Sequence, residues 1–219
     1  MIDLAGPAAA VASRRAELPA GRALLVGVSG IDGSGKGYLA SRFRDHLQRS
    51  ELRVALLNVD GWLNLPSVRF SRTDPGGHFY RHGLRLDELF ARLVLPLRDR
   101  RTHRLEAEFA EETASTYRPH LYAFNDVDVV LLEGIFIFKR AYRSHFDLAF
   151  WIDCTFDTAL ERALRRAQEG LPPAETIEAY RTIYFPAQRL HQERDQPRGG
   201  ADQIIVNDPR LGSQTEVGG

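Results

Sequence analysis

A glycine-rich segment near the N-terminus has the residues and the spacing needed to bind a chain of phosphates. Residues 27–38 read GVSGIDGSGKGY. Gly30, Gly35 and Lys36 match the pattern G-x-x-x-x-G-K-[ST], in which backbone N–H groups surround the phosphates and the lysine reaches the outer ones. Gly37 stands where the pattern has a serine or threonine, whose hydroxyl normally binds Mg²⁺. The segment therefore predicts a nucleotide site with an altered metal position.

The sequence around this segment predicts the strand, loop and helix that such a site requires. The apolar run ALLVGVSG predicts a buried strand, and GKGYLASRF predicts a helix whose N-terminus attracts phosphate. Only Lys36 and Lys139 are lysines among 29 basic residues, so the loop lysine is not a generic surface cation. A plain glycine-rich turn is the alternative. We expect the nucleotide to contact Gly30, Ile31, Asp32, Gly33, Ser34, Gly35, Lys36, Gly37 and Tyr38.

Two carboxylates follow predicted strands farther along the chain. Asp60 comes after the apolar run at 54–59, and Glu133 closes the run DVDVVLLEG. Parallel sheets place ligands at the carboxyl ends of their strands. Asp60 has the chemistry to accept a proton from a hydroxyl or to reach a metal, and Glu133 to hold Mg²⁺ through water, which would offset the oxygen missing at Gly37. The alternatives are a turn residue for Asp60 and a hydrogen-bonding carboxylate for Glu133.

A predicted helix carries arginines with the spacing of a phosphate clamp. In FDTALERALRRAQEG, Arg162 and Arg166 lie four residues apart and hence on one helix face. Such a pair can neutralise a phosphoryl group during its transfer. A solvated arginine face is the alternative. We expect Lys36, Asp60, Arg162 and Arg166 to act in catalysis, and Asp60 and Glu133 to serve the metal.

Composition favours one compact domain that acts on a small molecule. The chain has 219 residues, 43% of them apolar, and no net charge, with a pI near 7.1, so nucleic acid is not an expected partner. The single Cys154 excludes an internal disulfide and a cysteine-based zinc site, which fits a cytoplasmic location. No apolar run approaches the ~20 residues of a membrane span, so no membrane partner is expected.

Apolar periodicity predicts an α/β fold in which strands alternate with helices. Expected buried strands are 24–28, 54–59, 127–132, 148–153 and 203–206, and expected helices are 36–49, 86–98, 155–168 and 174–194. Two strand-like pieces, 103–109 and 116–124, interrupt the alternation. We expect an N-terminal extension at 1–20, a main domain at 21–211 with a hairpin insert at about 103–124 and a lid at about 160–172, and a flexible tail at 212–219.

With these motifs in place, the chain resembles the uridine kinase branch of the phosphoribulokinase and uridine kinase family of P-loop kinases. The resemblance runs from about residue 24 to 208. The stretches that carry it, in the family's order, are GVSGIDGSGKGYLA, NVDGWL, DVVLLEGIFIF, FDLAFWIDCTFDTALERALRR, YRTIYFPAQ and ADQIIVND. It implies a P-loop NTPase fold with a parallel sheet of about five strands flanked by helices, a small β-hairpin over the acceptor pocket and a helical lid.

The resemblance also implies roles for individual residues. Asp60 matches the general base, Glu133 the acidic residue of the L-x-E-G-I strand, and Arg162 with Arg166 the lid arginines. The pocket residues that it implies are Trp62, Phe79, Tyr80 and, by a looser match, Phe109. Two departures concern function: Gly37 replaces the family's Ser or Thr, and Tyr80 replaces an Asp that grips ribose hydroxyls. The hairpin also lacks a clear match to the Tyr and His that read a pyrimidine.

We therefore expect an ATP- and Mg²⁺-dependent kinase that phosphorylates a hydroxyl of a small metabolite, with a pyrimidine nucleoside favoured. A sugar, glycerate or pantothenate-like acceptor fits the donor residues equally well. A non-catalytic nucleotide-binding protein and an NTPase with water as acceptor are further alternatives. The sequence leaves open the choice between ATP and GTP and whether the chain forms a homo-oligomer.

Overall fold

The computed structural model describes residues 2–167, 170–212 and 215–217 and contains a central six-stranded sheet. Its strand order is β2-β5-β1-β6-β7-β8, in which the first five strands are parallel and β8 is antiparallel to β7. The bounds are β1 (Leu24–Gly30), β2 (Val54–Asn58), β5 (Val129–Glu133), β6 (Leu148–Asp153), β7 (Gln203–Val206) and β8 (Thr215–Val217). The five parallel strands confirm the predicted fold class.

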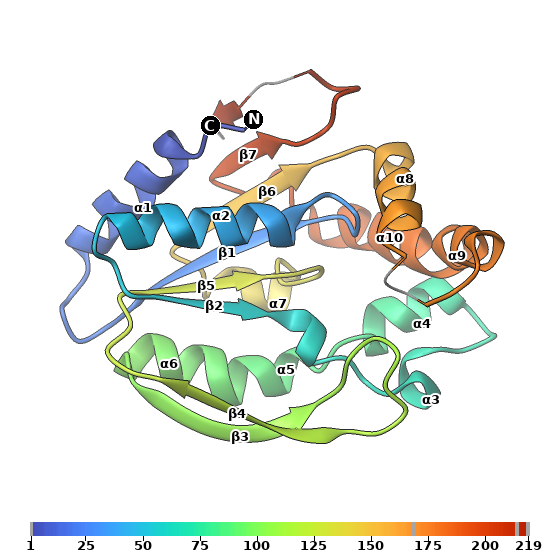
Figure 1. Ribbon diagram of the computed structural model, residues 1–219, viewed down its shortest axis with the longest axis horizontal. Coiled ribbons are helices and arrows are strands. Elements are labelled where there is room, and N and C mark those ends of the chain that lie inside the picture. Colours follow the sequence, from blue (N-terminus) through green and yellow to red (C-terminus); the bar gives the residue numbers. More distant parts are fainter. Residues whose placement is uncertain (1, 168–169, 213–214, 218–219) are drawn as a thin grey trace.

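The sheet is covered by helices on both faces (Figure 1). Residues of α1 and α2 pack on one face, and residues of α4 to α6 and α10 pack on the other. Every residue of β1 is buried, and its side chains alternate between the two cores, which is why this strand has a continuous apolar sequence. The helices are α1 (Ala5–Glu17), α2 (Lys36–Arg49), α3 (Pro66–Arg69), α4 (Pro75–His82), α5 (Leu86–Leu89), α6 (Leu95–Arg100), α7 (Arg140–Arg143), α8 (Phe156–Arg166), α9 (Pro173–Ala179) and α10 (Phe185–Asp195).

Two of the predicted helices contain a π-helical turn. The turns span Phe90–Val94, between α5 and α6, and Tyr180–Tyr184, between α9 and α10. In each case a proline, Pro96 or Pro186, follows two residues later. Proline has no N–H to donate and its ring crowds the preceding turn, so the backbone widens locally rather than stopping.

The hairpin insert forms a separate two-stranded antiparallel sheet. Strands β3 (His103–Phe109) and β4 (Arg118–Phe124) pair along their whole length, with Ala107 opposite His120 and Leu105 opposite Tyr122. One isolated bridge, between Trp62 and Ala110, joins the end of β3 to the segment that follows β2. The hairpin therefore lies beside the carboxyl end of β2, where Asp60 is found.

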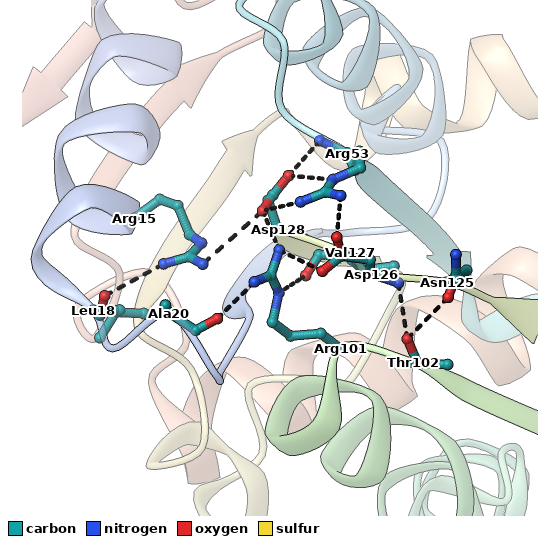
Figure 2. A network of polar contacts seen from close by, with 10 residues as sticks. All are labelled: Arg15, Leu18, Ala20, Arg53, Arg101, Thr102, Asn125, Asp126, Val127 and Asp128. Carbon is teal, nitrogen blue, oxygen red and sulfur yellow. Dashed lines mark hydrogen bonds and ion pairs between the residues drawn. The ribbon is translucent and has the colours of Figure 1, made fainter.

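The N-terminal extension is part of the folded core. Helix α1 buries Leu4, at its N-cap, together with Ala8 and Val11 against α2 and the sheet. In the last turn of the same helix, Arg15 contributes to a polar network at the amino-terminal edge of the sheet (Figure 2). The centre of that network is Asp128, which accepts hydrogen bonds from Arg53 and Arg101 and lies 3.9 Å from an Arg15 guanidinium nitrogen. The extension is thus attached to the domain by apolar packing and by charge.

Candidate active site

The phosphate-binding loop joins β1 to α2 and is stabilised from two other elements. Gly33 and Gly35 have φ angles of 76° and 86°, which L side chains rarely adopt. The carbonyl of Ser34 accepts hydrogen bonds from Asn207 Nδ2 at 2.7 Å and from Arg162 Nη1 at 3.1 Å. The loop is therefore shaped by its glycines and stabilised by Asn207, which follows β7, and by Arg162 on α8.

Asp32 in the loop is surrounded by cationic and hydroxyl groups. Its carboxylate lies 3.7 Å from Lys36 Nζ and 3.5 Å from an Arg166 guanidinium nitrogen, and it accepts a hydrogen bond from the Tyr180 hydroxyl. Burial opposes ionisation, but Lys36, Arg166 and Tyr180 together lower the pKa of Asp32. Its backbone N–H donates to Gln188 Oε1 at 2.9 Å. Asp32 thus connects the loop to α8 and α10.

Glu133 ends β5 directly behind the loop. It is 4% exposed, and its Oε2 atom has no hydrogen-bond partner within the described part of the chain. Burial raises its pKa to about 7, Lys36 opposes this shift, and Asp60 adds to it. A Cβ atom built on Gly37 would lie 3.4 Å from Glu133 Oε1. The buried carboxylate therefore faces the position where the loop lacks a side chain.

Asp60 lies at the carboxyl end of β2, on a short 3₁₀ turn capped by Asn58. The Asn58 side chain accepts a hydrogen bond from the Asp60 backbone N–H at 2.6 Å. The residue is open to solvent, but the protein atoms around its carboxyl raise the pKa of Asp60, with Lys36 opposing and Asp32 reinforcing the shift. Asp60, Lys36, Glu133 and Asp32 therefore form one electrostatic group around the loop.

The two expected arginines reach the loop by different contacts. Arg162, on α8, donates to the carbonyls of Gly33 and Ser34. Arg166, one turn later, contacts Asp32 and the Tyr180 hydroxyl. Both side chains therefore lie on the side of α8 that faces the loop.

Residues 168 and 169 of the expected lid lie outside the described residues, as do 213, 214, 218 and 219 of the expected tail.

A cavity of about 560 Å³ opens beside Asp60, between β2 and the hairpin. Its lining combines aromatic rings with carboxylates, and the described lining residues include no lysine or arginine. The His120 ring centroid lies 5.0 Å from that of Phe109 and 4.5 Å from that of Tyr122. The residues that line the cavity are Leu56, Leu57, Asn58, Asp60, Gly61, Phe109, Glu111, Glu112, Thr113, His120, Tyr122 and Phe124.

The four expected pocket residues fall in two places. Phe109 lines the cavity, with its ring so close to Gly61 that a Cβ there would lie 2.4 Å from Cε2. Trp62, Phe79 and Tyr80 are buried in the core, at 0%, 4% and 8% exposure. Trp62 stacks under Tyr122 with ring centroids 5.8 Å apart, so it supports the cavity wall from behind.

Two wall residues, His120 and Tyr122, were not singled out from the sequence. A signal was present, because His120, Tyr122 and Phe124 alternate with other residues along β4 and must share one face of the hairpin. What the sequence does not contain is the direction in which that face points. Asn207, Gln188 and Tyr180 were also missed, since their contacts with the loop join segments more than 140 residues apart.

The residues behind the loop fit a metal that arrives together with phosphates. Within the described ranges, no group of three or more His, Cys, Asp or Glu side chains can hold a metal alone. Glu133 nevertheless offers a buried oxygen without a partner, and Asp60 a carboxylate open to solvent. Oxygen ligands of this kind suit Mg²⁺, which commonly takes one or two carboxylates plus nucleotide phosphates.

Comparison with known proteins gives one match to a family model and several to individual kinases. The model described as methylmalonyl Co-A mutase-associated GTPase MeaB matches residues 7–94, which include the phosphate-binding loop. A uridine kinase from Limosilactobacillus reuteri (strain DSM 20016) is 24% identical over 197 residues, covering 85% of this chain and 88% of that protein.

Solved structures extend the likeness to nearly the whole chain. A possible uridine kinase from Bacillus stearothermophilus has a TM-score of 0.70 at 20% identity and covers 94% of this chain and 99% of its own. D-glycerate 3-kinase from Cryptococcus neoformans var. grubii has a TM-score of 0.66 at 16% identity, with 97% and 98% covered. No helix among the described residues has the length and apolar character needed to cross a membrane. The comparisons confirm the resemblance to uridine kinase-like P-loop kinases that the sequence showed.

Proposed function

We propose that this protein is an ATP-dependent kinase that transfers the γ-phosphoryl group to a hydroxyl of a small metabolite that carries an unsaturated ring, with a pyrimidine nucleoside favoured. The single observation that supports this most is the cavity lined by aromatic residues, which opens beside Asp60, a carboxyl group whose pKa responds to Lys36 of the phosphate-binding loop. A loop for the donor and a cavity for an acceptor are the two sites that phosphoryl transfer needs.

The chain's own residues have complementary tasks in this proposal. Backbone N–H groups of the loop and Lys36 hold the phosphates of the donor. Asp60 accepts the proton of the attacking hydroxyl, since the acceptor cavity opens beside its carboxylate. Arg166 leaves its contact with Asp32 to neutralise charge on the transferring group, and Arg162 keeps the loop in shape through two of its carbonyls.

Glu133 and Asp60 are the residues that would hold Mg²⁺. When bound, the ion would neutralise charge on the outer phosphates and orient them. The unpartnered oxygen of Glu133 supports this assignment, because a buried carboxylate without a partner is costly unless a cation balances it.

The charge of the cavity bears on the choice of acceptor. Asp60, Glu111 and Glu112 line it, and the described lining residues include no cation that could bind a carboxylate. An anionic acceptor such as glycerate would meet like charges and lose affinity. Flat rings, in contrast, would pack against Phe109, His120 and Tyr122, which favours a nucleoside over a glycerate- or pantothenate-like acceptor.

The experiment that tests the proposal is ATP consumption with Mg²⁺ against a panel of acceptors. The panel holds uridine, cytidine, fructose, glycerate and pantothenate, and each is run with wild type, Lys36→Ala and the control Arg44→Ala, an exposed arginine on the same helix. We expect turnover that requires a nucleoside and is lost only in Lys36→Ala. Hydrolysis that is equal with and without every acceptor would instead indicate an NTPase, a class that the MeaB match keeps in view.

A further inference from the structure

The absence of a side chain at residue 37 has no structural cause in the loop. Gly37 lies in the first turn of α2 and is not among the glycines with positive φ, so its backbone accepts any L-residue. The three atoms nearest to a Cβ at this position all belong to the Glu133 carboxyl group, and the closest lies at 3.4 Å, an ordinary van der Waals approach. Neither backbone strain nor packing therefore requires glycine at residue 37. The position is distinguished by the Glu133 carboxyl group that it faces.

What it faces is a carboxylate that lacks a partner. Glu133 is 4% exposed, and no described residue donates to its Oε2 atom. Lys36 is the nearest cation in sequence to Gly37, but its ion pair is with Asp32, at 3.7 Å. Lys36 acts on the Glu133 carboxylate through its charge, but no ion pair joins the two among the described residues, and burial still raises the pKa of Glu133. A cation that arrives with a ligand would supply the direct partner that the carboxylate lacks.

A hydroxyl at residue 37 and the Glu133 carboxylate would compete for the same space. A side-chain oxygen that points from the Cβ toward Glu133 would enter the 3.4 Å gap between them. In phosphate-loop proteins the loop hydroxyl binds the ion together with an acidic residue from a strand. With no oxygen at residue 37, the carboxylate has free access to the ion.

We infer that Glu133 binds the nucleotide-bound divalent cation directly through its carboxylate, in the space that Gly37 leaves open, rather than through an intervening water. This rests on the proposed nucleotide site. Gly37 then determines which residue binds the metal: the ligand comes from Glu133 on the strand and not from a hydroxyl of the loop. A Gly37→Ser variant gains a hydroxyl but moves Glu133 away from the ion.

The test uses Mn²⁺ with ADP as the probe and protein labelled with ¹³C-glutamate. Electron–nuclear double resonance detects a strong ¹³C coupling only when a labelled carboxylate is bonded to Mn²⁺. We expect that coupling in wild type and in the control Glu17→Gln, whose exposed side chain pairs with Arg14 on α1. We expect its loss in Glu133→Gln, together with at least a tenfold weaker affinity for Mn²⁺·ADP, and a clear decrease in Gly37→Ser.

Two results would overturn the inference and are distinguishable. Tight binding of Mn²⁺·ADP without the strong coupling in wild type would place Glu133 behind a water and leave the proposed kinase function standing. No binding of Mn²⁺·ADP by wild type that shows native unfolding behaviour would remove both the inference and the proposed function.

Discussion

At the scale of single residues, Asp60 links the acceptor cavity to the loop by charge. Its carboxyl group lines the cavity, and its pKa responds to Lys36. Its raised pKa makes it a better proton acceptor than an ordinary aspartate, provided that it is ionised at the working pH.

Asp60→Asn removes the proton acceptor and keeps the size of the side chain. We expect acceptor-dependent transfer to fall by about 10² to 10⁴-fold, the usual range for a general base. Affinity for ADP measured without a divalent ion should stay within a few-fold of wild type, because no hydrogen bond or ion pair joins Asp60 to the loop among the described residues. Steady-state kinetics measure the transfer activity, and calorimetric titration with ADP measures the nucleotide affinity. Full transfer activity in the variant would show that another group takes the proton.

His120→Ala tests whether the aromatic wall binds the acceptor. The substitution removes one ring from the row formed with Phe109 and Tyr122. We expect KM for the acceptor to rise about tenfold, the cost of about 1.4 kcal/mol of lost stacking, with KM for ATP unchanged. His46→Ala, on the surface of α2, is the matched control. Equal KM values for the acceptor in all three proteins would exclude His120 from the site.

The sequence predicted the donor side of the site better than the acceptor side, for a physical reason. Residues 30–38 are contiguous, so their spacing alone describes how they surround a phosphate. The acceptor cavity instead collects residues from 56–61 and 109–124, and which of their faces meet depends on tertiary packing. Trp62 and Tyr80 are examples, because the sequence alone does not show whether an aromatic residue in a predicted loop lines a pocket or packs in the core.

At the scale of elements, α10 connects the loop to a buried polar cluster. Gln188 accepts from the loop, and at the end of the same helix Asp195 accepts from the Tyr80 hydroxyl at 2.6 Å and lies 2.7 Å from His191 Nδ1. Burial opposes the ionised form, but these partners and the Arg140 backbone N–H lower the pKa of Asp195 to about 2. The cluster therefore holds α4, α7 and α10 together.

Because the pKa of Asp195 is lower in the folded than in the unfolded chain, its contribution to stability is present above about pH 4 and is lost between about pH 4 and 2. A shift of this size corresponds to on the order of 2 kcal/mol. We expect Asp195→Asn to reduce the free energy of unfolding at pH 7 and to flatten its decline with acidification. Urea unfolding across that pH range measures both. Parallel curves for wild type and variant would contradict the assignment.

Gly61→Ala tests how the hairpin closes the cavity. The added Cβ would lie 2.4 Å from the Phe109 ring and 3.3 Å from the Tyr122 hydroxyl, so the hairpin face must move away from β2. We expect weaker acceptor binding, by about tenfold, with little change in the affinity for nucleotide. Gly21→Ala, where a Cβ meets nothing within 4 Å, is the control. A crystal structure of the variant would show whether the Phe109 ring has shifted.

Secondary structure was largely predictable, and the exceptions have named causes. The strands at 148–153 and 203–206 and the helix at 36–49 have the predicted bounds, because their apolar periodicity is regular. The helices predicted at 86–98 and 174–194 run through Pro96 and Pro186, but the π-helical turns before these prolines were not predicted, because apolar periodicity does not show where the backbone widens.

At the scale of the whole molecule, α1 is a structural component of the domain. The sequence marked residues 1–20 as an extension, but Leu4, Ala8 and Val11 complete the core on one face of the sheet. The sequence does not show that a second helix must cover this face of the sheet. The apolar side chains of α2 are enough to predict that one helix packs there.

Deleting residues 2–17 should therefore destabilise the protein rather than leave it unchanged. The deletion exposes apolar surface of α2 and the sheet and removes Arg15 from the network around Asp128. Val11→Ala is the milder version and should cost about 1 to 3 kcal/mol, since the side chain is fully buried. Arg14→Ala, an exposed neighbour, is the control. Thermal unfolding of the four proteins tests the ranking, and an unchanged midpoint in the deletion would show that α1 is dispensable.

The separate pairing of β3 and β4 has a consequence for how such a protein can change over evolutionary time. The two hairpin strands pair with each other and not with the main sheet, and the hairpin is held on the central fold by packing such as that of Ala107 and Tyr122. Recombination between related genes could exchange the hairpin without altering the strand pairing of the main sheet or the phosphate-binding loop. Acceptor preference and donor use are then free to diverge at different rates, and new preferences can arise without first losing the fold.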